Sequence, residues 1–202
     1  MPDLPTTDPG EAGSPSTVTA ADLAVLSEDS ARDAAVFVAT VTEVASGAAP
    51  DAALPMTLLA LSQVIVMGAR LGAIEDVVPL ERFEADPGPD PELDPLRESL
   101  ANLFEGIDTY ADVVDPVTTP ELSTGTLSND LVEIVAALAH GLTHHAAGRS
   151  TEALWWWQFS YLSDWGERAA MALRVVQTLL SHVRLDADDE IVAEAEFDAL
   201  HP

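Results

Sequence analysis

The chain contains no cysteine and no lysine, and these two absences remove several kinds of chemistry. Without cysteine it forms no disulfide, no thiolate metal site and no cysteine nucleophile. Without lysine it has neither a Schiff-base amine nor the phosphate-binding lysine of a Walker motif. It also lacks a Gly-x-Ser-x-Gly elbow, a glycine-rich phosphate loop and a dinucleotide fingerprint. The common catalytic motifs are therefore missing.

Positive charge is scarce as well: 8 basic residues face 35 acidic ones, which gives a formal charge of −27 over 202 residues. Such a surface repels phosphate backbones and anionic lipid head groups, so we expect no direct binding to nucleic acid or to membranes. The first 20 residues lack the basic and apolar regions of a signal peptide. The longest apolar stretch, residues 54–67, is too short to span a bilayer. We therefore expect a cytoplasmic protein.

Apolar residues recur at helical spacing through most of the chain, and no stretch alternates with the period of two that predicts a strand. Residues 1–20, rich in Pro, Thr and Ser, have no periodicity and are expected to be a mobile tail. Before the C-terminal half we predict three helices and two loops. The helices run from caps at Ser27–Ser30 to Gly47, over about 55–70 and over about 94–113, and the loops cover 78–95 and 115–126.

The strongest periodicity lies in residues 128–184. Ser128 is expected to cap a helix that ends at Gly148, and Ser150 or Thr151 to cap a long partner that continues to about Val183. Apolar residues on the partner alternate spacings of four and three, which predicts a seam made of Trp155, Phe159, Leu162, Gly166, Ala169, Leu173, Val176, Leu180 and Val183. The predicted fold is an all-α single-domain bundle of about five helices over 21–184, with a long C-terminal helical hairpin and an acidic tail over 185–202.

Several short motifs resemble the uncharacterised bacterial DUF5063 family over roughly residues 30–184. They are Gly106-Ile-Asp-Thr-Tyr110 with Asp115-Pro116, Asp130-Leu-Val-Glu-Ile, Glu152-Ala-Leu-Trp-Trp-Trp, Asp164-Trp165-Gly166 and Ala172-Leu-Arg174. The family pattern has histidines around the Trp-Gly step, where this chain has Asp164, Glu167 and Arg168. The resemblance implies a helical fold and no particular activity.

Three consecutive tryptophans cannot all face one core, because helical neighbours are about 100° apart. Trp155 lies on the predicted seam, so Trp156 and Trp157 are candidates for contact with another helix or with a partner protein. Burial of all three in the core is the plainer alternative. Arg174, near the edge of the seam, is a further candidate for partner binding, although it could simply neutralise local carboxylates.

Two acidic pairs at i, i+3 lie on the facing helices of the predicted hairpin: Asp130 with Glu133, and Asp164 with Glu167. Residues whose numbers sum to about 298 should lie level on the two helices, so the four carboxylates could meet and hold Mg²⁺ or Mn²⁺. The plainer alternative is an ion pair between Asp130 and Arg168. His140, His144 and His145 are expected to interact with the helix dipole near a C-terminus.

The sequence thus favours a non-catalytic helical module without a cofactor, which binds a basic protein partner or self-associates. The alternative is a divalent-metal-dependent all-α hydrolase of phosphorylated small molecules, with Asp130, Glu133, Asp164 and Glu167 as ligands.

Overall fold

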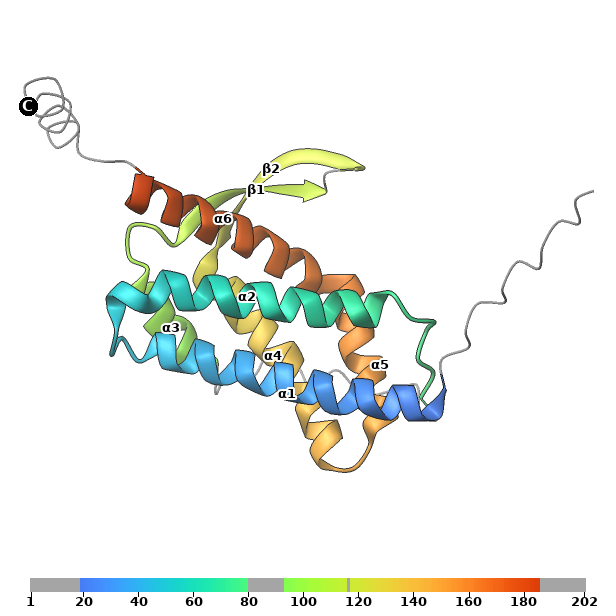
Figure 1. Cartoon of the computed structure of the whole chain (residues 1–202). Coiled ribbons are helices and arrows are strands. Elements are labelled where there is room, and N and C mark those ends of the chain that lie inside the picture. The colour runs from blue at the N-terminus through green and yellow to red at the C-terminus, as the bar shows by residue number, and fades with distance from the viewer. Residues whose placement is uncertain (1–18, 80–92, 116, 186–202) are drawn as a thin grey trace, which may run out of the picture.

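The computed structural model describes residues 19–79, 93–115 and 117–185. The fold is all-α, as predicted, and within these residues it adds one small β-hairpin. The predicted tails, apart from Thr19 and Ala20 at one end and Leu185 at the other, lie outside the described residues. Figure 1 shows the helices of the N-terminal half side by side and the hairpin above the last helix.

Helix α1 (Ala20–Ala45) begins earlier than predicted. Thr19 and Asp22 form a capping box, in which each side chain accepts a hydrogen bond from the other residue's backbone N–H. Ser27 and Ser30, the predicted caps, are instead buried inside the helix. The predicted end is confirmed, because Gly47 follows the helix with a φ of 66°.

Helix α2 (Pro50–Gly72) starts at Pro50, and Pro55, the predicted first residue, lies inside it. It contacts α1 on one side and the C-terminal helix on the other. By length and composition alone α2 could cross a membrane, but a core helix of a soluble protein passes the same test. Met67, Leu61 and Leu71 of α2 are buried in the common core.

Helix α3 (Asp94–Leu103) is ten residues long and ends well before the predicted Val113. After Gly106, with a φ of 84°, the chain forms strand β1 (Thr109–Asp115) and returns as β2 (Thr119–Thr126). The predictions of a helix to 113 and of a loop over 115–126 were therefore wrong. The Leu and Phe spacing that indicated helix ends at Phe104, whereas the following segment is rich in Thr and Val, which favour strands.

The helical hairpin consists of α4 (Leu127–Ala146) and a long partner that turns at Gly148. Ser128 does not cap α4. Its backbone N–H and its hydroxyl both donate to the Asp108 carboxylate, at 2.8 and 2.7 Å, so a residue just before the β-hairpin satisfies the helix start. The predicted alignment of the two helices places residues whose numbers sum to about 298 side by side. It is confirmed by the contact between Asp130 and Arg168.

The partner helix is not continuous. It consists of α5 (Ser150–Ser160), a π-helical turn (Tyr161–Trp165) and α6 (Gly166–Leu185). In Figure 1, α5 runs steeply across the bundle, whereas α6 lies along α2. Gly166 permits this turn, because a Cβ there would overlap the Tyr161 carbonyl oxygen. Counted as one bent helix, the three segments bring the described residues to five helices.

The π-turn contains one more residue than an α-helical turn, and this extra residue shifts the buried stripe. After the turn Ala169 and Val176 are buried, as the predicted seam requires. Before the turn the buried residues include Leu154 and Gln158, each one position earlier than Trp155 and Phe159 of the seam. The predicted seam is therefore confirmed at Ala169 and Val176, wrong at the end of α6, where Val183 is 73% exposed, and wrong by one residue along α5.

Candidate functional site

The three tryptophans of α5 occupy three different environments. Trp157 is fully buried, and its indole Nε1 donates to the Leu138 carbonyl of α4 at 3.1 Å. Trp156 is half-buried, donates to the Ala137 carbonyl at 2.8 Å and lies 4.2 Å, centroid to centroid, from the His140 ring. Trp155 is half-buried against the core, and its ring stacks on that of Phe159 at a centroid distance of 5.7 Å. Trp157 therefore cannot contact a partner, and Trp156 mainly anchors α5 to α4.

The π-turn leaves apolar side chains on the surface beside Trp155. Phe159 is 53% exposed and Leu162 is 63% exposed. Together with the segment after α2 they line a groove of about 560 Å³, which we call the Trp155 groove. Its described lining residues are Asp76, Val77, Val78, Pro79, Trp155, Gln158, Phe159, Leu162 and Ser163.

Gln158 fixes the second wall of this groove. Its side-chain oxygen accepts from the Val77 N–H at 2.8 Å, and its nitrogen donates to the Leu71 carbonyl at 2.9 Å. A buried amide with partners on both ends rigidifies the segment that it joins. The segment after α2 is thereby held against α5, so the groove has one aromatic wall and one backbone wall.

The charges around the Trp155 groove are negative. Asp76 lines it, Glu75 is the preceding exposed residue, and Glu152 lies one turn before Trp155 on α5. None of the described residues that line the groove is basic. Arg174 is exposed on α6 and does not line it, so the predicted grouping of Arg174 with the tryptophans is not formed.

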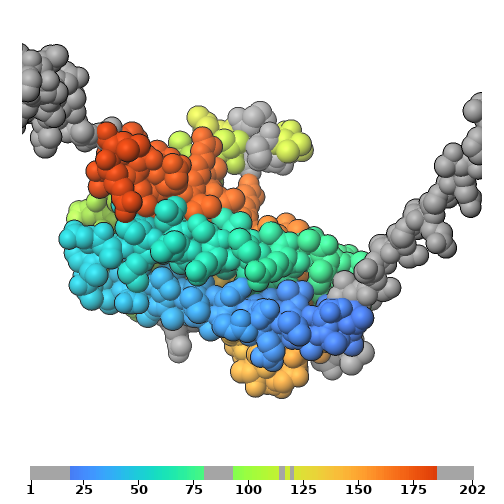
Figure 2. All heavy atoms as spheres, viewed as in Figure 1, coloured from blue at the N-terminus to red at the C-terminus, as the bar shows by residue number. Residues whose placement is uncertain are grey.

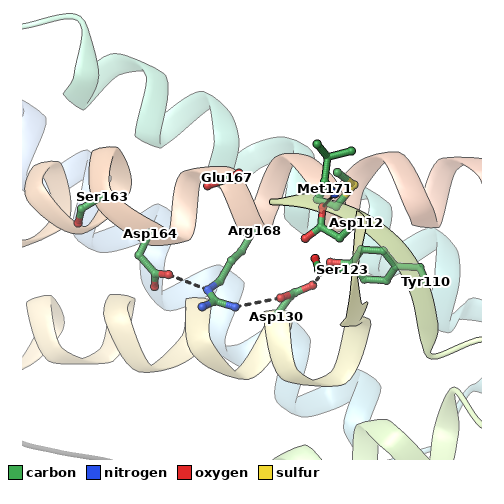
Figure 3. Close-up of a pocket in the computed structure, with 10 residues that line it drawn as sticks. Tyr110, Asp112, Ser123, Asp130, Ser163, Asp164, Glu167, Arg168 and Met171 are labelled. Carbon is green, nitrogen blue, oxygen red and sulfur yellow. Dashed lines mark hydrogen bonds and ion pairs between the residues drawn. The ribbon is translucent and has the colours of Figure 1, made fainter. Parts of the chain in front are cut away.

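A second concavity, the Asp130 pocket, encloses about 230 Å³ between the β-hairpin, α4 and the region around the π-turn. Figure 3 shows Arg168 between Asp164 and Asp130, with Tyr110 of β1 on the far side of Asp130. Arg168 donates to Asp164 at 2.7 Å and to Asp130 at 3.2 Å. The Tyr110 hydroxyl donates to the other oxygen of Asp130. Each oxygen of the buried Asp130 carboxylate thus has a donor.

Burial sets the direction of the pKa shifts of Asp130 and Tyr110, whereas ion pairs set that of Arg168. It raises the pKa of Asp130, against the opposing effect of hydrogen bonds from Tyr110 and Arg168. The pKa of Tyr110 is raised by burial and by its hydrogen bond to Asp130, which disfavours the phenolate. Burial by itself would lower the pKa of Arg168, but interactions with Asp164 and Asp130 outweigh it and raise that pKa.

The four predicted metal ligands do not converge. Asp130, Asp164 and Glu167 line the Asp130 pocket, but Glu133 pairs with Arg97 of α3 at 3.0 Å. The Arg168 guanidinium lies between Asp130 and Asp164 and uses their oxygens. Among the described residues no group of three or more His, Cys, Asp or Glu could hold a metal ion. The predicted ion pair of Asp130 with Arg168 is confirmed.

The three histidines of α4 make separate contacts and do not form one site. The ring of His140 lies against Trp156, and His144 lies 5.0 Å from His140, centroid to centroid. His145 Nε2 lies 3.3 Å from a Glu28 carboxylate oxygen on α1. His144 and His145 are in the last turn of α4, where the sequence places them near the negative end of the helix dipole.

Comparisons with known proteins give a family and a fold. A family model described as a domain of unknown function, DUF5063, matches residues 22–182. The crystal structure of protein BF1032 from Bacteroides fragilis superposes with a TM-score of 0.60 at 16% sequence identity, covering 79% of this chain and 92% of that one. At this identity the likeness shows the shared fold alone. No curated protein matches the chain.

Proposed function

Because the chain belongs to the DUF5063 family, whose description names no activity, we propose a function from the geometry alone: the protein is a cytoplasmic, non-catalytic module that binds a basic, amphipathic segment of another protein in the Trp155 groove. The observation that carries this proposal is the half-buried Trp155 stacked on Phe159, which is exposed beside Leu162, in the lining of a groove of about 560 Å³.

Aromatic side chains at such a surface can contribute most of an interface's binding energy. Burial of an exposed Phe or Leu stabilises a complex by about 1.5–3 kcal/mol. The apolar stripe from Trp155 to Leu162 runs about 10 Å along the helix, since each residue rises 1.5 Å. A stripe of this length fits two apolar side chains on successive turns of a partner helix, which is a common mode of helix recognition.

The charge of the surroundings favours a basic partner. Asp76 lines the groove, Glu75 precedes it in the chain, and Glu152 lies one helical turn before Trp155. The whole chain carries −27. Lysine or arginine residues flanking the partner's apolar side chains would meet these carboxylates, which mainly raises the association rate and the specificity. An acidic partner with the same apolar side chains would be repelled.

The geometry gives less support to a metal-dependent hydrolase. Arg168 holds the oxygens of Asp130 and Asp164 that a divalent cation would need, and Glu133 points to Arg97. We therefore keep this alternative only as an outcome that the experiment must be able to detect.

Three synthetic helical peptides test the proposal by fluorescence anisotropy. One has Leu and Phe on successive turns and lysines on the other face, the second has the same apolar face with glutamates, and the third has the lysines with alanines on the apolar face. We expect binding of the first peptide only. The Phe159→Ser/Leu162→Ser variant should weaken it at least tenfold, because two apolar contacts are lost.

The matched control is Leu59→Ser/Val66→Ser, which changes two exposed apolar residues of α2, 63% and 51% exposed, and should leave binding unchanged. Equal binding of the first and third peptides, or equal binding by the groove variant, would refute the Trp155 groove as the docking site. Site-specific heat on titration with Mg²⁺ or Mn²⁺, lost in Asp164→Asn/Glu167→Gln, would favour the hydrolase instead.

A further inference from the structure

Helices α2 and α6 lie side by side and run in opposite directions (Figure 1). A Cβ at Gly68 would meet Trp165, whereas one at Gly72, later on α2, would approach Leu162, earlier in the partner helix. Because each residue rises about 1.5 Å in both helices, residues whose numbers sum to about 233 lie level along the pair. Figure 2 shows the two helices at the surface, with no described segment over them in this view. Their solvent-facing sides therefore form one open surface.

This surface, which we call the α2–α6 face, exposes Leu59 and Val66 of α2 and Arg174 and Arg184 of α6. The leucine is 63% exposed and the valine 51%. Leu59 lies level with Arg174, so the apolar and the basic side chains belong to the same face. Less than half of the most apolar stretch of α2 is buried inside the protein. A segment that covered these side chains would gain free energy from their burial.

Acidic residues are nearly absent from the two helices, although the chain has 35 of them. Residues 52–74 and 168–185 contain none. The acidic residues of the pair are Asp51, in the first turn of α2, and Glu167, which lines the Asp130 pocket. Within the described part of the chain, neither arginine of the α2–α6 face has a carboxylate partner, and the arginine ion pairs lie elsewhere. In a chain of −27, this face therefore attracts negative charge.

The segment that follows α6 has the complementary composition. Residues 186–202 contain seven acidic residues and no arginine or lysine, together with the apolar side chains Ile191, Val192, Phe197 and Leu200. An acidic segment that stays in solvent is poor in aromatic and β-branched residues. The α2–α6 face offers these side chains both an apolar surface and unpaired cations.

We propose that residues 186–202 fold back onto the α2–α6 face of their own chain, with Phe197 covering Leu59 and with carboxylates beside the two arginines. The length of the segment permits this arrangement. Leu59 lies level with a point about 17 Å before Leu185, the last residue of α6. Phe197 follows Leu185 by twelve residues, which span up to about 40 Å when extended. The reach is therefore more than twice the distance to be covered.

Attachment to the same chain makes a weak contact sufficient. A segment on a short linker meets its site at an effective concentration in the millimolar range. Charge also selects this surface, because the carboxylates of residues 186–202 are repelled by the acidic remainder of the chain. The proposal does not rest on the peptide-binding function, because none of the side chains that it uses lines the Trp155 groove.

A nitroxide spin label on the full chain tests the proposal, since the chain has no cysteine of its own. The label is attached through Ala195→Cys, and the NMR amide signals of the isotope-labelled protein are compared with the nitroxide oxidised and reduced. We expect strong broadening of the amide signals of Leu59 and Val66 and little broadening at His145, at the far end of α4.

Two double variants separate the apolar contact from a general effect. In the spin-labelled chain, Leu59→Ser/Val66→Ser should lower the ratio of docked to undocked segment at least tenfold, because two apolar contacts are lost. The matched control, Phe159→Ser/Leu162→Ser in the Trp155 groove, should leave the ratio unchanged. Circular dichroism checks that both variants keep their helices.

A second pair of variants tests the charges. Arg174→Gln/Arg184→Gln should also lower the ratio of docked to undocked segment, because the segment loses its cationic partners. Arg32→Gln/Arg149→Gln removes the same charge at exposed positions outside the α2–α6 face and should have no effect. Equal effects of the two variants would mean that net charge alone matters, and this result would contradict the proposed contacts.

Three outcomes would overturn the proposal. The first is the absence of broadening on α2, or broadening that Leu59→Ser/Val66→Ser leaves unchanged. The second is broadening in a mixture of spin-labelled and isotope-labelled chains at the same strength, which would show that the segment docks on another copy. The third is broadening centred on Phe159, which would place an acidic segment in the Trp155 groove and contradict the proposed basic partner as well.

Discussion

Replacement of Gly141 by alanine tests the close contact that joins α4 to α5. A Cβ at this position would overlap the indole of Trp157, which is fully buried and donates to the Leu138 carbonyl. The indole must therefore move. Overpacking of a tight core costs about 1–3 kcal/mol, and loss of the hydrogen bond costs about 1 kcal/mol.

The better helix propensity of alanine offsets up to about 1 kcal/mol of this cost. We therefore expect Gly141→Ala to lower the free energy of unfolding by about 1–3 kcal/mol, which corresponds to about 3–10 °C in Tm for a domain of this size. Urea unfolding followed by circular dichroism measures the effect. A control on the exposed side of the same helix, Thr143→Ala, should change stability by less than about 0.5 kcal/mol.

A double-mutant cycle separates the indole contact from a general effect on α4. Trp157→Leu removes the indole Nε1 and Cε2, the two atoms that the new Cβ would approach most closely, so in that background Gly141→Ala should cost less than half as much. If Gly141→Ala is as stable as the wild type, or if its cost is the same in both backgrounds, the proposed packing of α5 on α4 is refuted.

Three other predictions concern single contacts. Tyr110→Phe should cost about 1–3 kcal/mol in urea unfolding, because it leaves an oxygen of the buried Asp130 carboxylate without its donor. Because the pKa of Asp130 is raised in the folded state, its protonation contributes to the free energy of unfolding below the usual aspartate pKa. This contribution is lost as the pH rises through the raised pKa. Over that range the free energy of unfolding of the wild type should fall relative to that of Asp130→Asn. Thr19→Ala should cost about 1 kcal/mol and speed amide exchange in the first turn of α1; unchanged exchange would contradict the capping box.

The sequence predicted the helical hairpin well because its signal is long. The apolar periodicity of residues 128–184 covers many turns, and the turn at Gly148 sets which residues lie level, so the contact of Asp130 with Arg168 followed from arithmetic. Long, regular elements are predicted best, since every turn repeats the same evidence.

The β-hairpin was not predicted because the alternation of apolar and polar residues that indicates a strand is weak in its sequence. A strand with one buried face alternates apolar and polar residues, but in β1 the ring of Tyr110 and the carboxylate of Asp112 share one face. Neither face is uniformly apolar, so the period of two is weak. The β-branched residues of 109–126 were the signal that could have found it.

The site was only partly predictable for a similar reason. The sequence placed Asp130, Asp164 and Glu167 close together but could not decide whether a metal or Arg168 would fill the space between them. The buried stripe of α5 was misassigned by one residue, because a π-turn leaves no clear pattern among apolar residues: the buried stripe with Leu154 and the predicted one with Trp155 are both hydrophobic. The glycine at 166 was the local indication of an irregular turn.

The extra residue between Tyr161 and Trp165 also makes the buried face of α5 independent of the buried face of α6. Because the turn resets the angular position of every later side chain, substitutions on α5 can alter the groove without changing how α6 lies along α2. A single-residue deletion there would instead turn the α5 side chains by about 100° relative to α6 and carry Phe159 toward the protein interior. One insertion of this kind is enough to move an apolar side chain from the core to the surface.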